Sequence, residues 1–99
     1  MYKLIALYKK PDDVDGFLKH YHETHLPLVA KTPGLEKTVL NRVTAAPMGG
    51  EPDYFLIAEM HYPDKDAFET AMASEENRAA GKDLMSFAKG LVTLLVAVE

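Results

Sequence analysis

The sequence predicts an α+β domain of the ferredoxin-like class, with the element order βαββαβ and a four-stranded antiparallel sheet. Four segments rich in β-branched and aromatic residues predict the strands, and segments with apolar residues at steps of three and four predict the helices. Strand, helix and strand follow one another twice. The 99 residues, of which 47% are hydrophobic, suffice for one core, so the whole chain, 1–99, is expected to form a single domain.

The first strand is expected at residues 2–8, where YKLIALY is bounded by two lysines and Pro11. Asp12 or Asp13 can then cap a helix by accepting hydrogen bonds from its first free amides. Along this helix an apolar stripe recurs at alternating steps of three and four: Val14, Leu18, Tyr21, His25 and Leu28. This spacing predicts that His25 points inward.

Pro27 follows His25 by two residues and interrupts the helical pattern. Proline has no N–H to donate to the carbonyl of Glu23, and its ring crowds that carbonyl, so the helix is expected to end or kink across residues 23–26. A short helical turn is expected to continue beyond Pro27. His25 would therefore be a titratable ring at a helix end, facing apolar neighbours.

The rest of the chain supplies three strands and a second helical region. Pro33 and Gly34 end the first helical region, and Ser74 can cap the last helix. Residues 45–53 hold four Pro or Gly residues, which predicts a mobile connection that can also serve as a lid. The expected elements are a strand at 35–44, a strand at 54–62, a helix at 64–73, a helix at 75–89 and a strand at 91–98.

Both faces of the later strands are apolar, although helices cover only one face of such a sheet. In the last strand Leu95 and Ala97 oppose Leu94 and Val96. An uncovered apolar face of this kind would exceed the few hundred Å² that monomers usually expose. The sequence therefore predicts a homodimer formed through the uncovered sheet face, which makes a dimeric α/β barrel with room for a small ligand between the two sheets.

Glu59 and His61 are the polar exceptions on the third strand, where alternation puts both on the same face as Phe55 and Ile57. Apolar neighbours disfavour the charged form of a carboxylate, which is one route to a general acid or base. The alternative is that Glu59 pairs with a lysine or arginine across the strands, or that its face borders solvent near the mouth of the barrel. His61 lies one residue from the strand end and is expected to be exposed.

Three histidines have the spacing His20-x-His22-x-x-His25, and neutral imidazole is a common metal ligand. On a helix, however, His20 and His22 point about 200° apart and cannot meet at one ion. His22 and His25 are neighbours but supply only two ligands. No metal site is predicted, and no motif indicates a cofactor, because Gly49 and Gly50 lack the further glycines and the following helix of a phosphate loop.

Composition argues against several classes of protein. The net charge of −4 is spread without a basic cluster, which argues against nucleic acid as a partner. The absence of cysteine excludes disulfides and thiolate catalysis. The longest apolar run, at residues 91–98, is far below the ~20 residues of a membrane span, and the first residues do not form a signal peptide. No membrane association and a cytoplasmic location are therefore expected.

Two groups of residues form a family signature. The first group follows the pattern F-x3-Y-x3-H-x-P-L and then Pro-Gly, with Phe17, Tyr21, His25, Pro27, Leu28, Pro33 and Gly34. The second group comprises Asp53, Glu59, Phe68, Ser74, Asp83, Phe87 and Gly90. With these residues the chain resembles the EthD family, small proteins associated with the breakdown of ethyl tert-butyl ether. It departs at His22, where family members usually carry tryptophan.

The resemblance implies a dimeric α/β barrel, the architecture of cofactor-independent quinol monooxygenases, muconolactone isomerases and dye-decolorising peroxidases. It also implies an association with oxidative degradation. Some larger members look like decarboxylases, so the resemblance is more specific about the fold than about the reaction.

Two classes of function remain open for the expected cavity. An enzyme would bind a small hydrophobic or aromatic ligand, and His25 would move a proton. Glu59 would orient His25 or act as the second acid or base, and Tyr21 would donate a hydrogen bond to a developing oxyanion. Such an enzyme would be a cofactor-independent oxidoreductase, a decarboxylase or an isomerase. A carrier or sensor of a hydrophobic metabolite, or an accessory protein to a monooxygenase, would use the same cavity, and His25 would only bond a backbone carbonyl.

Overall fold

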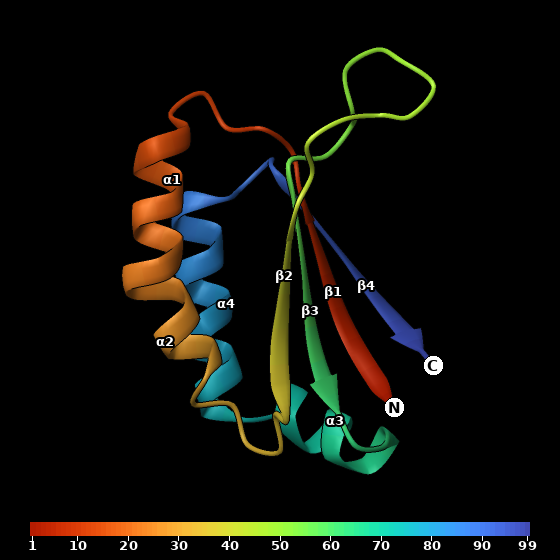
Figure 1. The fold of residues 1–99 in the computed structure, drawn as a ribbon. Coiled ribbons are helices and arrows are strands. Elements are labelled where there is room, and N and C mark those ends of the chain that lie inside the picture. Colours follow the sequence, from red (N-terminus) through yellow and green to blue (C-terminus); the bar gives the residue numbers. More distant parts are fainter.

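Four antiparallel strands form one sheet in the computed structural model, which describes residues 1–99, and the long helices lie on one face of this sheet (Figure 1). The strands lie in the order β2-β3-β1-β4. Their bounds are β1 (Tyr2–Tyr8), β2 (Lys37–Arg42), β3 (Leu56–Tyr62) and β4 (Val92–Val98). The predicted ferredoxin-like arrangement is confirmed, with β2 and β3 shorter than expected.

The helical segments are α1 (Val14–His20), a π-helical turn (Tyr21–His25), α2 (Leu26–Val29), α3 (Lys65–Met72) and α4 (Glu75–Phe87). Both predicted caps are present, because Asp13 Oδ1 accepts a hydrogen bond from the Gly16 amide at 3.0 Å and Ser74 Oγ accepts one from the Asn77 amide at 3.1 Å. None of these helices combines the length and the apolar composition that a membrane span requires.

The α-helix is interrupted where the sequence predicts an end or a kink, across residues 23–26, but the chain does not leave its helical path, because the helix widens into the π-helical turn and continues. The Leu26 N–H donates to the carbonyl of Tyr21, five residues back rather than four. Pro27 has no N–H for a bond to Glu23 and crowds the helix there, so a wider turn relieves the crowding without stopping the chain. The α-helical path resumes at Leu26.

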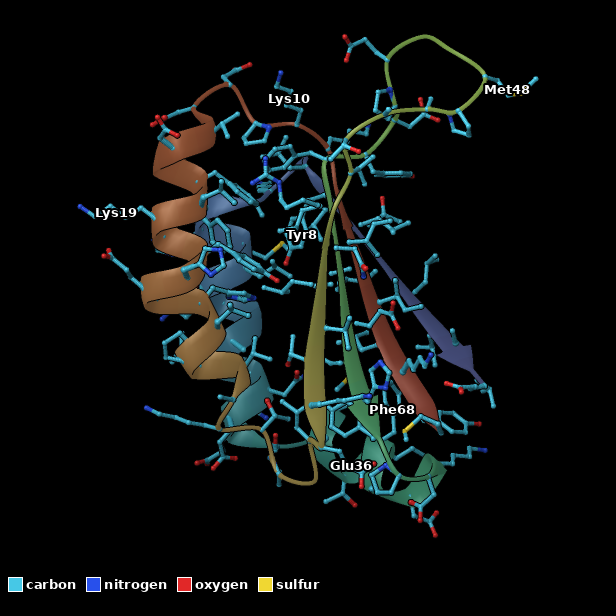
Figure 2. All side chains as sticks on the ribbon, viewed as in Figure 1. Tyr8, Lys10, Lys19, Glu36, Met48 and Phe68 are labelled. Carbon is cyan, nitrogen blue, oxygen red and sulfur yellow. The ribbon has the colours of Figure 1, made fainter.

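The core lies between the helices and the face of the sheet that they cover. Alternate residues of β1 and β3 point into it, among them Tyr8 and Leu56, which are nearly inaccessible. Tyr8 points from the sheet toward α1 (Figure 2). Its ring packs edge-on against the rings of Phe17 and Tyr21, at a centroid distance of 5.5 Å in each case. These aromatic contacts fix the first helical region to the sheet.

The other face of the sheet carries apolar side chains that no helix covers. Ile5 of β1 pairs with Leu95 of β4, and Leu7 of β1 pairs with Ile57 of β3. β4 forms the sheet edge that lies farthest from α1 and α2 (Figure 1). Its large apolar side chains are among the most exposed in the chain: Leu94 48%, Leu95 48%, Val96 58% and Val98 65%. β4 therefore exposes apolar side chains on both of its faces, as the sequence predicts.

Phe55 does not follow the alternation of β3. It precedes the strand in a bend, and its ring packs edge-on against Phe17 of α1 at a centroid distance of 6.3 Å. The residue is buried and belongs to the core. The prediction that Phe55 shares the uncovered face with Ile57 and Glu59 is wrong, because the bend redirects its side chain before regular pairing begins.

The connection between β2 and β3 projects beyond the end of the sheet (Figure 1). Residues 45–53 contain no helix or strand, and Met48 at the outer end of the loop is 95% exposed (Figure 2). Gly49 and Gly50 have φ values of +90° and +82°, which residues with a Cβ atom rarely adopt. The turn of this loop therefore depends on its two glycines.

Candidate functional site

A cavity of about 140 Å³ lies between the covered face of the sheet and the helices. Ten of its fourteen lining residues are hydrophobic, and none is Asp, Glu, Lys or Arg. The lining residues that carry polar side-chain atoms are Tyr8, His25, Thr32, Tyr62 and Asn77. The sequence predicts ligand space between two sheets, whereas this cavity lies within one chain on the opposite face. No residue of the 45–53 loop lines it, so the loop is not its lid in this structure.

His25 lies in the π-helical turn, is 5% exposed and lines the cavity. Its Nδ1 atom lies 3.0 Å from Oδ2 of Asp83 in α4. No hydrogen bond is formed by its other ring nitrogen, Nε2, and every fully buried side-chain nitrogen or oxygen in the structure has a partner. The Nε2 atom is therefore not fully buried, and His25 is one of the residues that line the cavity.

Asp83 also binds a second histidine. Its Oδ1 atom lies 2.9 Å from Nε2 of His20, the last residue of α1. A carboxylate can only accept, so both imidazoles donate an N–H to it. When His25 is neutral, its proton is therefore on Nδ1 and its lone pair is on Nε2, the ring nitrogen that bonds no other protein group. This is the arrangement that a histidine needs to act as a general base.

Burial lowers the pKa of His25 below its ordinary value, because an apolar environment disfavours the charged ring. The hydrogen bond and the negative charge of Asp83 act in the opposite direction, and the charge of His20 adds to the lowering. The net direction is downward, so His25 is neutral near pH 7 and its Nε2 lone pair is available.

Tyr21 packs beside His25, with ring centroids 5.6 Å apart, but it does not line the cavity. Burial raises the pKa of Tyr21 to about 12, although its hydrogen bond with Tyr8 opposes this rise. Burial also raises the pKa of Tyr8. Both side chains are therefore protonated phenols at neutral pH. Tyr8 lines the cavity and Tyr21 does not.

Glu59 lies on the uncovered face of the sheet, opposite in direction to Ala58 and Met60, and so does not meet His25 or Tyr21. Its Oε1 atom lies 3.5 Å from Nζ of Lys3 and 3.1 Å from Nε2 of His61. The alternative that the sequence leaves open, a cross-strand pair with lysine, is the observed one. The orientation of His25 by Glu59 is corrected, because Asp83 takes that place.

The surroundings of Glu59 also reverse the expected effect on its acidity. Burial alone would raise the pKa of Glu59, but the hydrogen bonds from His61 and Lys3 outweigh burial and lower it. Glu59 is therefore a stable carboxylate rather than a proton donor at neutral pH. His61 is 7% exposed, so the expectation that it is exposed is wrong. Lys3 and Lys37 are its cross-strand neighbours on the two adjacent strands.

The three histidines of the first helical region do not meet at one point. His20 and His25 approach different oxygens of Asp83, and His22 is exposed. No three histidine, aspartate or glutamate side chains have an arrangement that can hold a metal ion. The site therefore consists of two imidazoles that are hydrogen-bonded to one carboxylate.

Asp83, His20 and Tyr8 are site residues that the sequence reasoning did not select. Asp83 carries a recognisable signal, because it follows Ala80 by three residues and precedes Phe87 by four on the buried stripe of α4. A carboxylate on an apolar stripe needs a buried partner. The position of that partner, 58 residues away in the chain, follows only from the fold.

The fold and the site define a small ferredoxin-like domain with one apolar cavity and a histidine–aspartate pair beside it. Residues 9–90 match the EthD domain, and the chain belongs to the EthD family. An uncharacterized 11.0 kDa protein of Rhodococcus erythropolis, from the thcB-thcC intergenic region, is 30% identical over 99 residues, which cover all of this chain and 95% of that protein.

Solved structures agree with this assignment. An EthD family protein from Bacillus halodurans is 44% identical, with a TM-score of 0.94 over 100% of this chain and 98% of that one. A dimeric ferredoxin-like protein of unknown function from Thermobifida fusca has a TM-score of 0.70 at 16% identity, covering 99% of this chain and 90% of that one. SnoaB, a cofactor-independent oxygenase from Streptomyces nogalater, has a TM-score of 0.68 at 16% identity, covering 99% and 91%. The last two show a common fold.

Proposed function

We propose that the cavity binds a compact, mostly apolar molecule and that His25, held by Asp83, moves a proton to or from it. The observation that supports this most directly is the pairing of His25 Nδ1 with Asp83 at 3.0 Å, which leaves Nε2 unpartnered beside the cavity. An imidazole held in this way is a general base with its lone pair directed at the ligand. The chain would then be an enzyme that needs no cofactor for its proton transfer.

The size and lining of the cavity indicate the class of ligand. A volume of about 140 Å³ is close to the engineered cavity of about 150 Å³ that binds benzene, so a ligand of one ring is the appropriate size. No lining residue carries a formal charge, which favours a neutral ligand over a carboxylate or an ammonium ion. This lining argues for proton abstraction from a neutral molecule rather than for decarboxylation of an anion.

The chemistry follows from the positions of three side chains. Nε2 of His25 takes a proton from an O–H or an acidic C–H bond of the ligand, and the imidazolium that forms is stabilised by Asp83. Tyr8 lines the same cavity as a neutral phenol whose O–H bonds Tyr21, and turning this O–H from Tyr21 to the ligand would give a hydrogen bond to the oxyanion that develops there. The anion can isomerise, or it can react with O2 if it is electron-rich; the shared fold with SnoaB is compatible with the second course.

The test is proton exchange on a one-ring probe, 3-cyclohexen-1-one, in D2O, followed by proton NMR. The wild-type protein is expected to accelerate exchange at the α-carbon and formation of the conjugated isomer. The His25→Gln protein is expected to lose this acceleration, because general-base catalysis supplies about 10²–10⁴-fold. His22→Gln is the matched control, since His22 is exposed and contacts no atom of Asp83. Exchange by His25→Gln at the wild-type rate would refute the proposal.

A carrier or sensor is the second candidate, and the apolar lining of the cavity favours it directly. Under this alternative the probe shifts the NMR signals of cavity residues equally in the wild type and in His25→Gln, and neither protein accelerates exchange. For a carrier or sensor, the sequence predicts that His25 bonds a backbone carbonyl. In the structure its Nδ1 atom bonds the Asp83 side chain instead.

We also propose that the chain forms a homodimer through the uncovered face of its sheet. Ile5, Leu7, Ile57 and Leu95 form a contiguous apolar surface there, because they are cross-strand neighbours or lie two residues apart on one strand. Relatives with the same fold, such as the Thermobifida fusca protein, are dimeric. Sedimentation equilibrium at micromolar concentration is expected to give twice the 11.0 kDa mass of the chain. A stable species of single mass would contradict the dimer.

A further inference from the structure

One carboxylate serves two imidazoles in this protein, and the two imidazoles face different environments. His25 is almost fully buried and lines the cavity, whereas the side chain of His20 is 34% exposed. His20 lines a separate hollow at the surface, together with Pro11, Phe17 and Phe87. The three side chains therefore form a row from the cavity to solvent, with Asp83 in the middle.

The π-helical turn explains how both histidines reach one carboxylate. In a regular α-helix, successive residues are about 100° apart, so His20 and His25 would point about 140° away from each other. A π-helical turn brings residues five apart onto the same side, because its hydrogen bonds join residues i and i+5. The bond from the Leu26 N–H to Tyr21 has this spacing. The turn that Pro27 provokes therefore aligns two imidazoles that an α-helix would separate.

The imidazole of His20 affects the charge of His25. A lone carboxylate beside a histidine favours the protonated ring, and a protonated His25 has no lone pair for a ligand proton. One carboxylate compensates one positive charge, and desolvation makes the buried ring the costlier place for that charge. Protonation at His20, the more accessible of the two rings, therefore satisfies Asp83 and opposes protonation of His25.

We propose that His20 is a positioning residue that takes the proton which Asp83 attracts, so that His25 stays neutral and keeps its lone pair on Nε2. This inference rests on the proposed role of His25 as a base. Asp83 still fixes the tautomer of His25, since it accepts from Nδ1 whether or not His20 is charged. Asp83 thus orients His25 while His25 stays unprotonated and can act as a base.

The other titratable groups that face His25 do not compete for this role. Tyr21 packs against it from the same helical region, while Tyr8 of β1 and Tyr62 of β3 line the cavity. Burial raises the pKa of each of these phenols, so they stay neutral across the range in which histidine titrates. Among the residues that line the cavity or bond His25, Asp83 is the one acid.

The test is a histidine titration by 15N NMR on the protein without ligand, comparing the wild type with His20→Gln. Glutamine cannot take a proton, so the pKa of His25 is expected to rise in this variant. His20→Asn is a second variant with the same expectation, and His22→Gln is the control that is expected to leave the pKa of His25 unchanged. A pKa of His25 that is unchanged or lower in folded His20→Gln and His20→Asn would overturn the proposal.

A merely structural role of His20 would not move the pH dependence of the base. In the exchange assay with 3-cyclohexen-1-one, the acid limb of the rate profile is expected to shift to higher pH in His20→Gln. An acid limb at the wild-type pH would overturn the proposal. The NMR titration needs no catalysis, so a protein that binds without exchange would refute the proposed function and still decide the role of His20.

Discussion

The two faces of the sheet are each associated with a carboxylate–histidine pair, and the two pairs differ in what surrounds them. On the covered side Asp83 holds His25 at 3.0 Å, and the free nitrogen of His25 meets the cavity. On the uncovered side Glu59 holds His61 at 3.1 Å, but Lys3 lies 3.5 Å from the same carboxylate oxygen. An acid–histidine pair is thus a candidate site when the histidine lines an apolar cavity, and a structural ion-pair network when a lysine already satisfies the acid.

The largest expected effect comes from removing each acid in turn. In Asp83→Asn the amide can also donate to His25, so the tautomer with its lone pair toward the cavity is no longer enforced, and the rate of exchange on 3-cyclohexen-1-one is expected to fall by about 10²-fold or more. In Glu59→Gln the rate is expected to stay near that of the wild type, because Glu59 does not line the cavity. Equal losses of exchange rate in Asp83→Asn and Glu59→Gln would contradict the assignment of the site to the covered side of the sheet.

The sequence predicts the fold well because its signals are local. Strand composition, the caps at Asp13 and Ser74 and the inward direction of His25 all depend on residues close in the chain. Alternation also predicts that β3 has two faces, but it does not say which face the helices cover. That choice decides whether Glu59 meets His25, and it depends on packing between distant segments.

The pairing of His25 with Asp83 also depends on packing between segments that are distant in the chain. It requires α4 to pack against the π-helical turn, and that turn is itself a departure from the periodicity on which sequence reasoning relies. Pro27 predicts a disturbance at the right place, but the form of the disturbance depends on the partners that the wider turn can reach. Tertiary contacts therefore decide the site where local rules end.

The uncovered face can be tested by placing a charge in its apolar patch. Leu95 pairs with Ile5 on this face and is 48% exposed in the single chain. In Leu95→Lys the proposed interface would bury an unpaired ammonium, which costs several kcal/mol, so the dissociation constant of the dimer is expected to rise by about 100-fold or more. Sedimentation measures the change, and Met48→Lys at the exposed loop is the control. If Met48→Lys dissociated the dimer and Leu95→Lys did not, the dimer interface would not be the uncovered face of the sheet.

The covered side can be tested by narrowing its cavity. Gly81 lies within α4 and lines the cavity, and a Cβ atom added there would meet nothing within 4 Å. Gly81→Ala is expected to raise the free energy of unfolding by about 0.5–1 kcal/mol, because alanine favours the helix, and to weaken binding of the probe. Chemical denaturation and NMR titration measure the two effects. Lys82→Ala, at an exposed position of the same helix, is expected to leave probe binding unchanged.

The smallest expected effect separates the two faces by pH. The pKa of His25 is lowered from its ordinary value of 6.5, so the unfolded chain binds the proton more readily, and stability is expected to decline as the pH falls below about 6.5. The pKa of Glu59 is lowered from 4.5, so its contribution is present above about 4.5 and declines only as the pH falls further. Denaturation of His25→Gln is expected to show a flatter dependence between about pH 7 and pH 5, whereas Glu59→Gln is expected to differ from the wild type mainly below that range. If His25→Gln kept the full slope between about pH 7 and pH 5, the buried histidine would not be the group that titrates in that range.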